Sequence, residues 1–136
     1  MQDSWKRGRE VMRESVKLLT EGENEQALNV IDTAIAEAIH ENHGRWALNL
    51  CRHAAIIAHS MGNYPRQIQY EEKALPFAEE YRFAAYNFAQ LLSKHGQVDR
   101  AEQYADEAYK LSVAGTTDAD RDLVAAILKQ WPNIAG

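Results

Sequence analysis

The segment FAAYNFAQLLSKHGQVDRAEQYADEAYKL, residues 83–111, is the clearest guide to the fold. Gly96 divides it into two amphipathic halves. Small residues stand seven positions before this glycine, at Ala89, and five and twelve positions after it, at Ala101 and Ala108. Apolar residues at helical spacing, with short side chains at fixed positions, predict two antiparallel helices that pack closely across a tight turn.

The same spacing occurs twice more, around Gly22 and around Gly62. The equivalent positions are Ser15, Ala27 and Ala34 in the first copy, and Ala55, Gln67 and Ala74 in the second. The three glycines are 40 and 34 residues apart, which indicates one helix-turn-helix unit used three times. Such units stack to bury their apolar faces, and the stack leaves a groove along one side.

The pattern of helix starts and stops predicts seven helices. We expect them at about 4–20, from 24 to the ENHG stretch at 41–44, at 45–60, from 64 onward, and at 82–94, 98–113 and 117–131. Ser4 and Asn24 are candidate N-caps, and Thr117 with Asp120 has the spacing of a capping box. Pro76 falls inside the fourth helix, where it predicts a kink or an early end.

Apolar stripes predict which face of each helix points inward. The expected inward residues are Ala27, Leu28, Ile31, Ala34, Ile35, Ala38 and Ile39 in the second helix, Ala101, Ala105, Ala108 and Leu111 in the sixth, and Leu123, Val124, Ile127, Leu128 and Trp131 in the last. The last helix has a more polar outer face, so we expect it to cap the stack.

Composition excludes several classes of protein. The 136 residues are 46% hydrophobic and carry a formal net charge of −5, which argues against a general nucleic-acid or anionic-membrane binder. The basic N-terminal segment is interpreted as a solvated helix face. A single cysteine, Cys51, and the lack of a signal peptide or membrane span predict a soluble, cytoplasmic protein.

The pattern resembles the tetratricopeptide repeat family, whose unit is a 34-residue helix-turn-helix. The resemblance covers about residues 8–115, with repeats at about 8–41, 45–80 and 82–115 and a capping helix at 117–131. It implies an all-α, right-handed α-solenoid of antiparallel helix pairs, in one domain over residues 1–136. The 40-residue spacing predicts about six extra residues in the second and third helices.

The resemblance also implies a site, because the family binds peptides or partner proteins in the concave groove lined by its first helices. The corresponding positions here are Arg9, Met12, Val16, Asn49, Arg52, His53, Ile56, His59, Phe83, Tyr86, Asn87 and Gln90. One subfamily grips a C-terminal carboxylate with lysines, asparagines and an arginine, and this chain lacks that set. A partner with an apolar anchor, and an acidic group at Arg52, fits better.

Catalytic and metal sites find little support in the sequence. Cys51 and His53 are two apart on a helix and point to different sides, so Cys51 is interpreted as a core residue. His40 and His43 are interpreted as solvated helix-end residues, with no metal and no cofactor expected. Among the aromatic residues, Phe88 is expected in the core, whereas Phe83 and Tyr86 belong either to the groove or to packing between repeats.

These observations predict a non-catalytic interaction module that binds a peptide or helix of another protein. A homodimer that packs through the last helix, with Trp131 and Ile134, is the alternative. A regulatory domain of a larger protein is a third interpretation.

Overall fold

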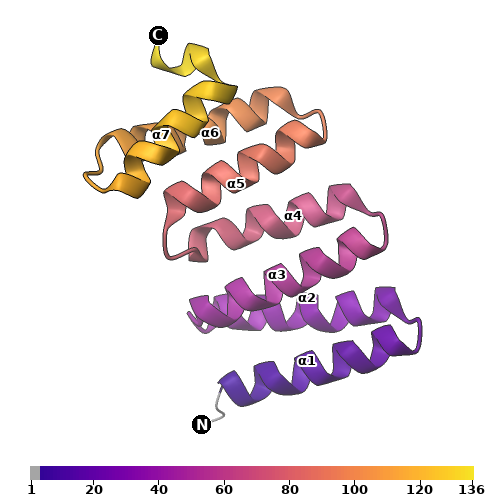
Figure 1. Cartoon of the computed structure of the whole chain (residues 1–136). Coiled ribbons are helices and arrows are strands. Elements are labelled where there is room, and N and C mark those ends of the chain that lie inside the picture. Colours follow the sequence, from indigo (N-terminus) through magenta and orange to yellow (C-terminus); the bar gives the residue numbers. More distant parts are fainter. Residues whose placement is uncertain (1–3) are drawn as a thin grey trace. The chain divides into compact units, whose positions relative to one another are not determined.

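The structure, a computed structural model, describes residues 4–136, with side chains from residue 6 onward. This part of the chain forms seven α-helices and two short 3-10 helices, and contains no strand (Figure 1). The α-helices are α1 (Ser4–Thr20), α2 (Asn24–His40), α3 (Gly44–Ser60), α4 (Tyr64–Ala74), α5 (Tyr81–Lys94), α6 (Val98–Val113) and α7 (Asp118–Gln130). The predicted all-α class is therefore confirmed.

The chain divides into two compact units, residues 1–77 and 78–136. Unit 1 contains α1 to α4 and the 3-10 helix η1 (Leu75–Phe77), and unit 2 contains α5 to α7 and the 3-10 helix η2 (Pro132–Ala135). Each unit has its own apolar core. The prediction that the chain is a single domain stays a prediction.

The core of unit 1 lies between helices that are neighbours along the chain. α1 packs on α2, α2 on α3, and α3 on α4, while α1 also contacts α3. Ile31 and Ile35 of α2, with Leu50 and Cys51 of α3, are almost completely buried. Burial raises the pKa of the Cys51 thiol to about 11, so this thiol stays protonated, and the prediction of a core cysteine is confirmed.

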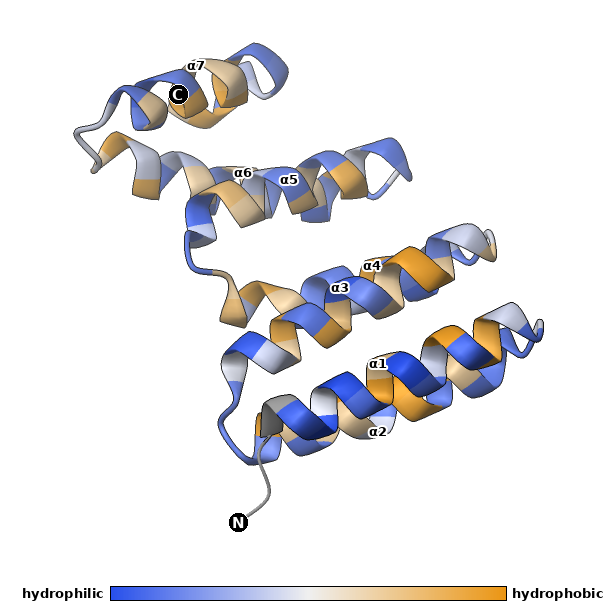
Figure 2. Ribbon diagram, turned by 60° about the horizontal axis from the view of Figure 1, so that its bottom comes forward, coloured by the Kyte–Doolittle hydropathy of each residue, from blue (hydrophilic) through white to orange (hydrophobic). Residues whose placement is uncertain are grey.

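The small residues of the repeat pattern are buried. They are Ser15, Ala27, Ala34, Ala55, Ala74, Ala89, Ala101 and Ala108. The exception is Gln67, which is half-buried and accepts a hydrogen bond at Oε1 from Nδ1 of His59, 3.1 Å away. Figure 2 shows hydrophobic and hydrophilic residues interleaved along each helix, as expected where one side of a helix is buried and the other is exposed.

The turns within the helix pairs use left-handed backbone. Gly22, Gly62 and Gly96 have φ angles of +79°, +73° and +80°, which glycine adopts without a steric cost. These glycines follow α1, α3 and α5, as predicted. Between α2 and α3 the left-handed residue is Asn42, with φ of +61°, and asparagine tolerates this conformation better than most residues.

Three details of the predicted helices are wrong. Ile39 and Leu111, expected to point inward, are 40% and 48% exposed, because each lies in the last turn of its helix, where its surface is less completely covered. In α6 the buried position is instead Ser112, whose hydroxyl donates to the carbonyl oxygen of Ala108 at 2.7 Å. Asn24 is the first residue of α2 rather than its cap.

The ends of the predicted helices are otherwise close to those observed. The cap predicted at Ser4 involves a side chain outside the described residues. The fourth helix ends at Ala74, and the chain continues through Pro76 as η1, which confirms the early end predicted there. α2 and α3 have 17 residues each and are longer than α4 and α5. The extra residues between Gly22 and Gly62 therefore lie in α2 and α3.

In unit 2, α7 begins with the predicted capping box. The backbone N–H of Asp120 donates to the Thr117 hydroxyl, and the Asp120 carboxylate accepts from the backbone N–H of Thr117. The same carboxylate accepts from Arg82 of α5 at 2.5 Å. Hydrogen bonds from Thr117, and then from Arg82, hold the pKa of Asp120 below its usual value. A side chain on Gly115 would collide with this carboxylate, so the loop before α7 needs glycine there.

Candidate functional site on the first helices

The groove residues predicted on α1 lie along one edge of this helix. Arg9 and Val16 are exposed, Val16 by 52%, and Met12 is half-buried against the core of unit 1. Arg13 is exposed and shares this edge, because residues three and four apart on a helix are neighbours.

The other edge of α1 faces α2. Arg7 forms an ion pair with Glu37 of α2, with 3.2 Å between Nε and Oε2. Its pKa is raised by Glu37 first, and to a smaller extent by Glu10 and Glu14. The two glutamates of α1 therefore lie near Arg7, and Glu10 also stands three residues before Arg13, within one helical turn.

On α3 the predicted groove residues Asn49, Arg52, Ile56 and His59 are all exposed. Ile56 is 68% exposed, more than any other large hydrophobic residue whose side chain the structure describes. Arg52 lies near Glu71 of α4, where its charge offsets part of the rise in the pKa of Glu71 that burial causes.

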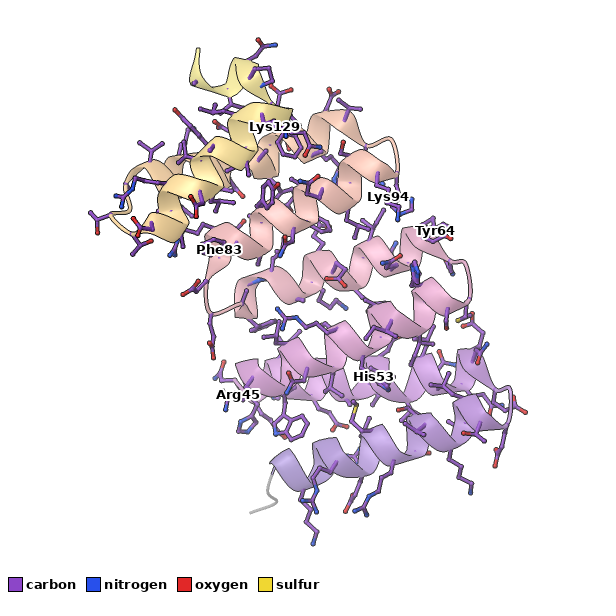
Figure 3. All side chains as sticks on the ribbon, in the orientation of Figure 1. Arg45, His53, Tyr64, Phe83, Lys94 and Lys129 are labelled. Atoms are coloured by element: carbon purple, nitrogen blue, oxygen red, sulfur yellow. The ribbon has the colours of Figure 1, made fainter. Side chains whose placement is uncertain are left out.

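His53 of α3 lies on the side of that helix toward α1 (Figure 3). Its Nε2 atom is 3.1 Å from Oγ of Ser15 on α1. Because the Ser15 hydroxyl donates to the carbonyl oxygen of Met12 at 2.8 Å, we assign the proton between His53 and Ser15 to Nε2 of the imidazole. Nearby, Gly8 of α1 leaves room for the ring of Trp46 on α3. His53 is thus half-buried between α1 and α3 rather than fully open to a ligand.

The surface around this junction is the candidate site of unit 1, and we call it the α1–α3 face. It consists of Arg9, Met12, Arg13 and Val16 of α1 and Asn49, Arg52, His53 and Ile56 of α3. Val16 and Ile56 each stand within one helical turn of the Ser15–His53 contact. The face therefore combines exposed apolar side chains with arginines on two helices that a partly buried polar contact holds together.

The Ser15–His53 contact predicts a dependence of stability on pH. Burial lowers the pKa of His53, so the folded state favours the neutral imidazole. Protonation then favours the unfolded chain, and stability falls as pH drops below about 6.5, the value of an unperturbed histidine. We expect His53→Gln, which keeps a donor and cannot titrate, to lose less stability than wild type when urea titrations at about pH 7.5 and about pH 5.5, on either side of that value, are compared. An equal loss in both proteins contradicts this assignment.

In unit 2 the predicted groove aromatics pack inside the unit. Tyr86 lies edge-on to Trp131, with 6.4 Å between ring centroids, and its hydroxyl accepts from Nε2 of Gln90 at 2.6 Å. The guanidinium of Arg82 lies 4.7 Å from the centre of the Phe83 ring. Of the two roles left open for Phe83 and Tyr86, packing on the core of α5, α6 and α7 is therefore observed.

Other predicted residues of unit 2 divide between its surface and its core. Asn87 is exposed on α5. Phe88 is buried, edge-on to Tyr104, so its predicted core role is confirmed. Trp131 and Ile134, expected at a dimer surface, pack against the core of unit 2, so part of their apolar surface is already covered.

A polar network between α2 and α4 has no counterpart among the sequence-based predictions. Arg66 of α4 forms ion pairs with Glu25 at 2.7 Å and with Asp32 at 3.4 Å. The hydroxyl of Tyr70 donates to Asp32 at 2.5 Å, and burial together with this bond raises the pKa of Tyr70 to about 12. The partners are more than thirty residues apart in the chain, and the network fixes α4 to α2.

The described residues hold no other evident kind of site. Among them, no group of three or more histidine, cysteine or carboxylate side chains could hold a metal ion. His40 and His43 are exposed at the end of α2 and just after it, and His43 lies 3.7 Å from a carboxylate oxygen of Glu41. Of the helices in residues 4–136, none is both long and apolar enough to cross a membrane.

Comparison with known proteins identifies the class of fold. The TPR domain of Arabidopsis FLU matches with a TM-score of 0.54 at 15% identity, over 83% of this chain and 100% of that domain. BtubC (BKLC) from P. vanneervenii matches with a TM-score of 0.58 at 14% identity, over 99% of this chain and 60% of BtubC. No family model and no curated protein matches the sequence. The chain therefore has a tetratricopeptide-like helical-repeat fold, as its residue pattern predicted.

Proposed function

We propose that this chain is a non-catalytic protein-interaction module, and that the α1–α3 face binds a segment of a partner protein. The observation that carries the proposal is the pair of exposed apolar side chains, Val16 and Ile56, beside the Ser15–His53 junction. Apolar side chains exposed together on a surface are a common mark of a protein-binding site. A contact between the two helices keeps the face preformed, which lowers the entropic cost of binding.

The tetratricopeptide-like fold supports the same function, since the sequence resemblance implies that the first helix of each pair faces the ligand. His59 of α3 extends the face toward the α3–α4 turn. Asn87 and Gln90 of α5, with the outer edges of Phe83 and Tyr86, are proposed as a second contact surface in unit 2. We propose no cofactor, and a cytoplasmic setting in which Cys51 remains a thiol.

Capture from a native lysate tests the proposal. Immobilised wild-type protein is compared with a Val16→Ser, Ile56→Ser double variant. The matched control is Ile39→Ser, Val113→Ser, which makes the same chemical change at two exposed positions on second helices. We expect a partner to be retained by wild type and control and to be reduced on the order of tenfold by the double variant, since each buried apolar anchor contributes about 1 kcal/mol or more. Equal retention by all three proteins contradicts the proposal.

A further inference from the structure

Asp120 is a charged residue at a core position of α7. The buried residues of three first helices follow one spacing, three and then four positions apart: Cys51, Ala54 and Ala58 in α3, Ala85, Phe88 and Leu92 in α5, and Asp120, Leu123 and Ile127 in α7. Asp120 is only 3% exposed and stands where α3 and α5 bury an uncharged side chain. A carboxylate at such a position costs free energy unless it is paired and hydrogen-bonded.

The carboxylate of Asp120 finds its partners within unit 2. It accepts a hydrogen bond from Nε of Arg82 on α5 at 2.5 Å, and two more from the hydroxyl and the backbone N–H of Thr117, at 2.8 and 3.2 Å. The side chain of Arg82 is itself partly buried. This ion pair is therefore shielded from water, unlike the exposed pair that Asp118 and Arg121 form in the first turn of the same helix.

Stability alone does not explain the Arg82–Asp120 pair. Both charges must be removed from water before they can pair, so a buried ion pair contributes little net stability. Apolar residues of similar volume in the same place are often equally stable or more stable. The repeat itself accommodates such residues, since Cys51 and Ala85 occupy the equivalent position and are completely buried.

The apolar side of α7 does not by itself select one position along the helix axis. Its apolar residues recur every three or four positions, at Leu123, Val124, Ile127, Leu128 and Trp131. A displacement by one turn, about 5.4 Å, brings each of them to the place of a neighbour in the stripe. The buried residues that α5 and α6 contribute to the shared core are Ala85, Ala89, Ala105 and Ala108. Their methyl groups offer little shape with which to distinguish one such register from the next.

We infer that the buried Arg82–Asp120 pair sets the register in which α7 docks in unit 2, and thereby positions Trp131 against Tyr86. In a register displaced by one turn, Arg82 faces an apolar residue of α7 and both charges lose their partner. Apolar arrangements of similar energy are then separated by the cost of an unpaired, partly buried charge, as a single polar contact does in coiled coils. The edge-on contact of Tyr86 with Trp131 therefore depends on Asp120, eleven residues earlier in the chain.

The inference concerns the docking of α7 and does not depend on the function proposed above. Fluorine NMR of protein labelled with fluorotryptophan tests it, because the chain has three tryptophans and a Trp131→Phe variant identifies the signal of Trp131. The test variant is Arg82→Met, Asp120→Leu, which replaces the buried pair by apolar residues. The matched control is Asp118→Leu, Arg121→Leu, which removes the exposed ion pair of the same helix turn. Circular dichroism and urea titration measure the helix content and the stability of each protein.

We expect a single sharp Trp131 signal in wild type and control. The apolar variant should give two or more Trp131 signals, or one broadened by exchange, at a urea midpoint equal to or above that of the control. A single sharp Trp131 signal in the apolar variant overturns the inference, because apolar packing would then set the register. A urea midpoint below that of the control also overturns it, since the pair would then act by stabilising the fold.

Discussion

Replacing Ile31 by alanine should lower the free energy of unfolding of unit 1 by about 3 kcal/mol. Ile31 is fully buried in the core that α1, α2 and α3 share. Removing its outer carbons loses their transfer free energy and leaves a cavity, because the surrounding helices relax only in part. Urea unfolding followed by circular dichroism measures the change.

Ile39→Ala is the matched control, since it makes the same change in the same helix at a side chain that is 40% exposed. We expect this variant to lose less than about 1 kcal/mol. Equal losses in the two variants would mean that α2 buries a different face from the one that contains Ile31.

A second large loss in the free energy of unfolding is expected where α5 and α6 pack most closely. Ala89 of α5 is completely buried and belongs to the small-residue pattern that specifies the fold. Ala89→Leu forces three more carbons into the contact between α5 and α6, which are the most closely packed pair of unit 2. We expect a loss of about 2–3 kcal/mol in the free energy of unfolding, from strained rotamers and separated helices.

The control for this variant is Ala125→Leu, at an exposed position on α7 of the same unit. Leucine and alanine are both good helix formers, so this change should leave the urea midpoint nearly unaltered. The small-residue explanation of the repeat fails if Ala89→Leu is as stable as Ala125→Leu.

Much of the fold was predictable because its determinants are local. Gly22, Gly62 and Gly96 end helices through their own backbone conformation, and Pro76 ends α4 through its missing N–H. The capping box of Thr117 depends on a residue only three positions away. Such signals lie within one or two turns of sequence and do not depend on the neighbouring helices.

The ends of the apolar stripes were not predictable in this way. Ile39 continues the spacing of α2 and Leu111 that of α6, yet both are exposed. Burial depends on how far the adjacent helix extends and on which side it packs. The apolar periodicity of a single helix carries no information about either. Ser112 takes an inward position because its hydroxyl is satisfied by the carbonyl oxygen of Ala108.

The surroundings of the candidate-site residues were still harder to predict, because they depend on contacts between residues far apart in the sequence. The contact between Ser15 and His53 joins residues 38 apart, and it turns a predicted groove histidine into a half-buried link between helices. Tyr86 and Trp131 pack edge-on, and the apolar pattern of either helix taken alone does not indicate this contact.

Site-specific photo-crosslinking in living cells tests the central claim most directly, because it captures a partner whose identity is still unknown. A photoreactive phenylalanine replaces Val16 or Ile56 on the α1–α3 face, and Ile39 or Val113 on second helices, all four being exposed. The account predicts crosslinks to the same partner from positions 16 and 56 and none from positions 39 and 113. Crosslinks confined to positions 39 or 113 would contradict it.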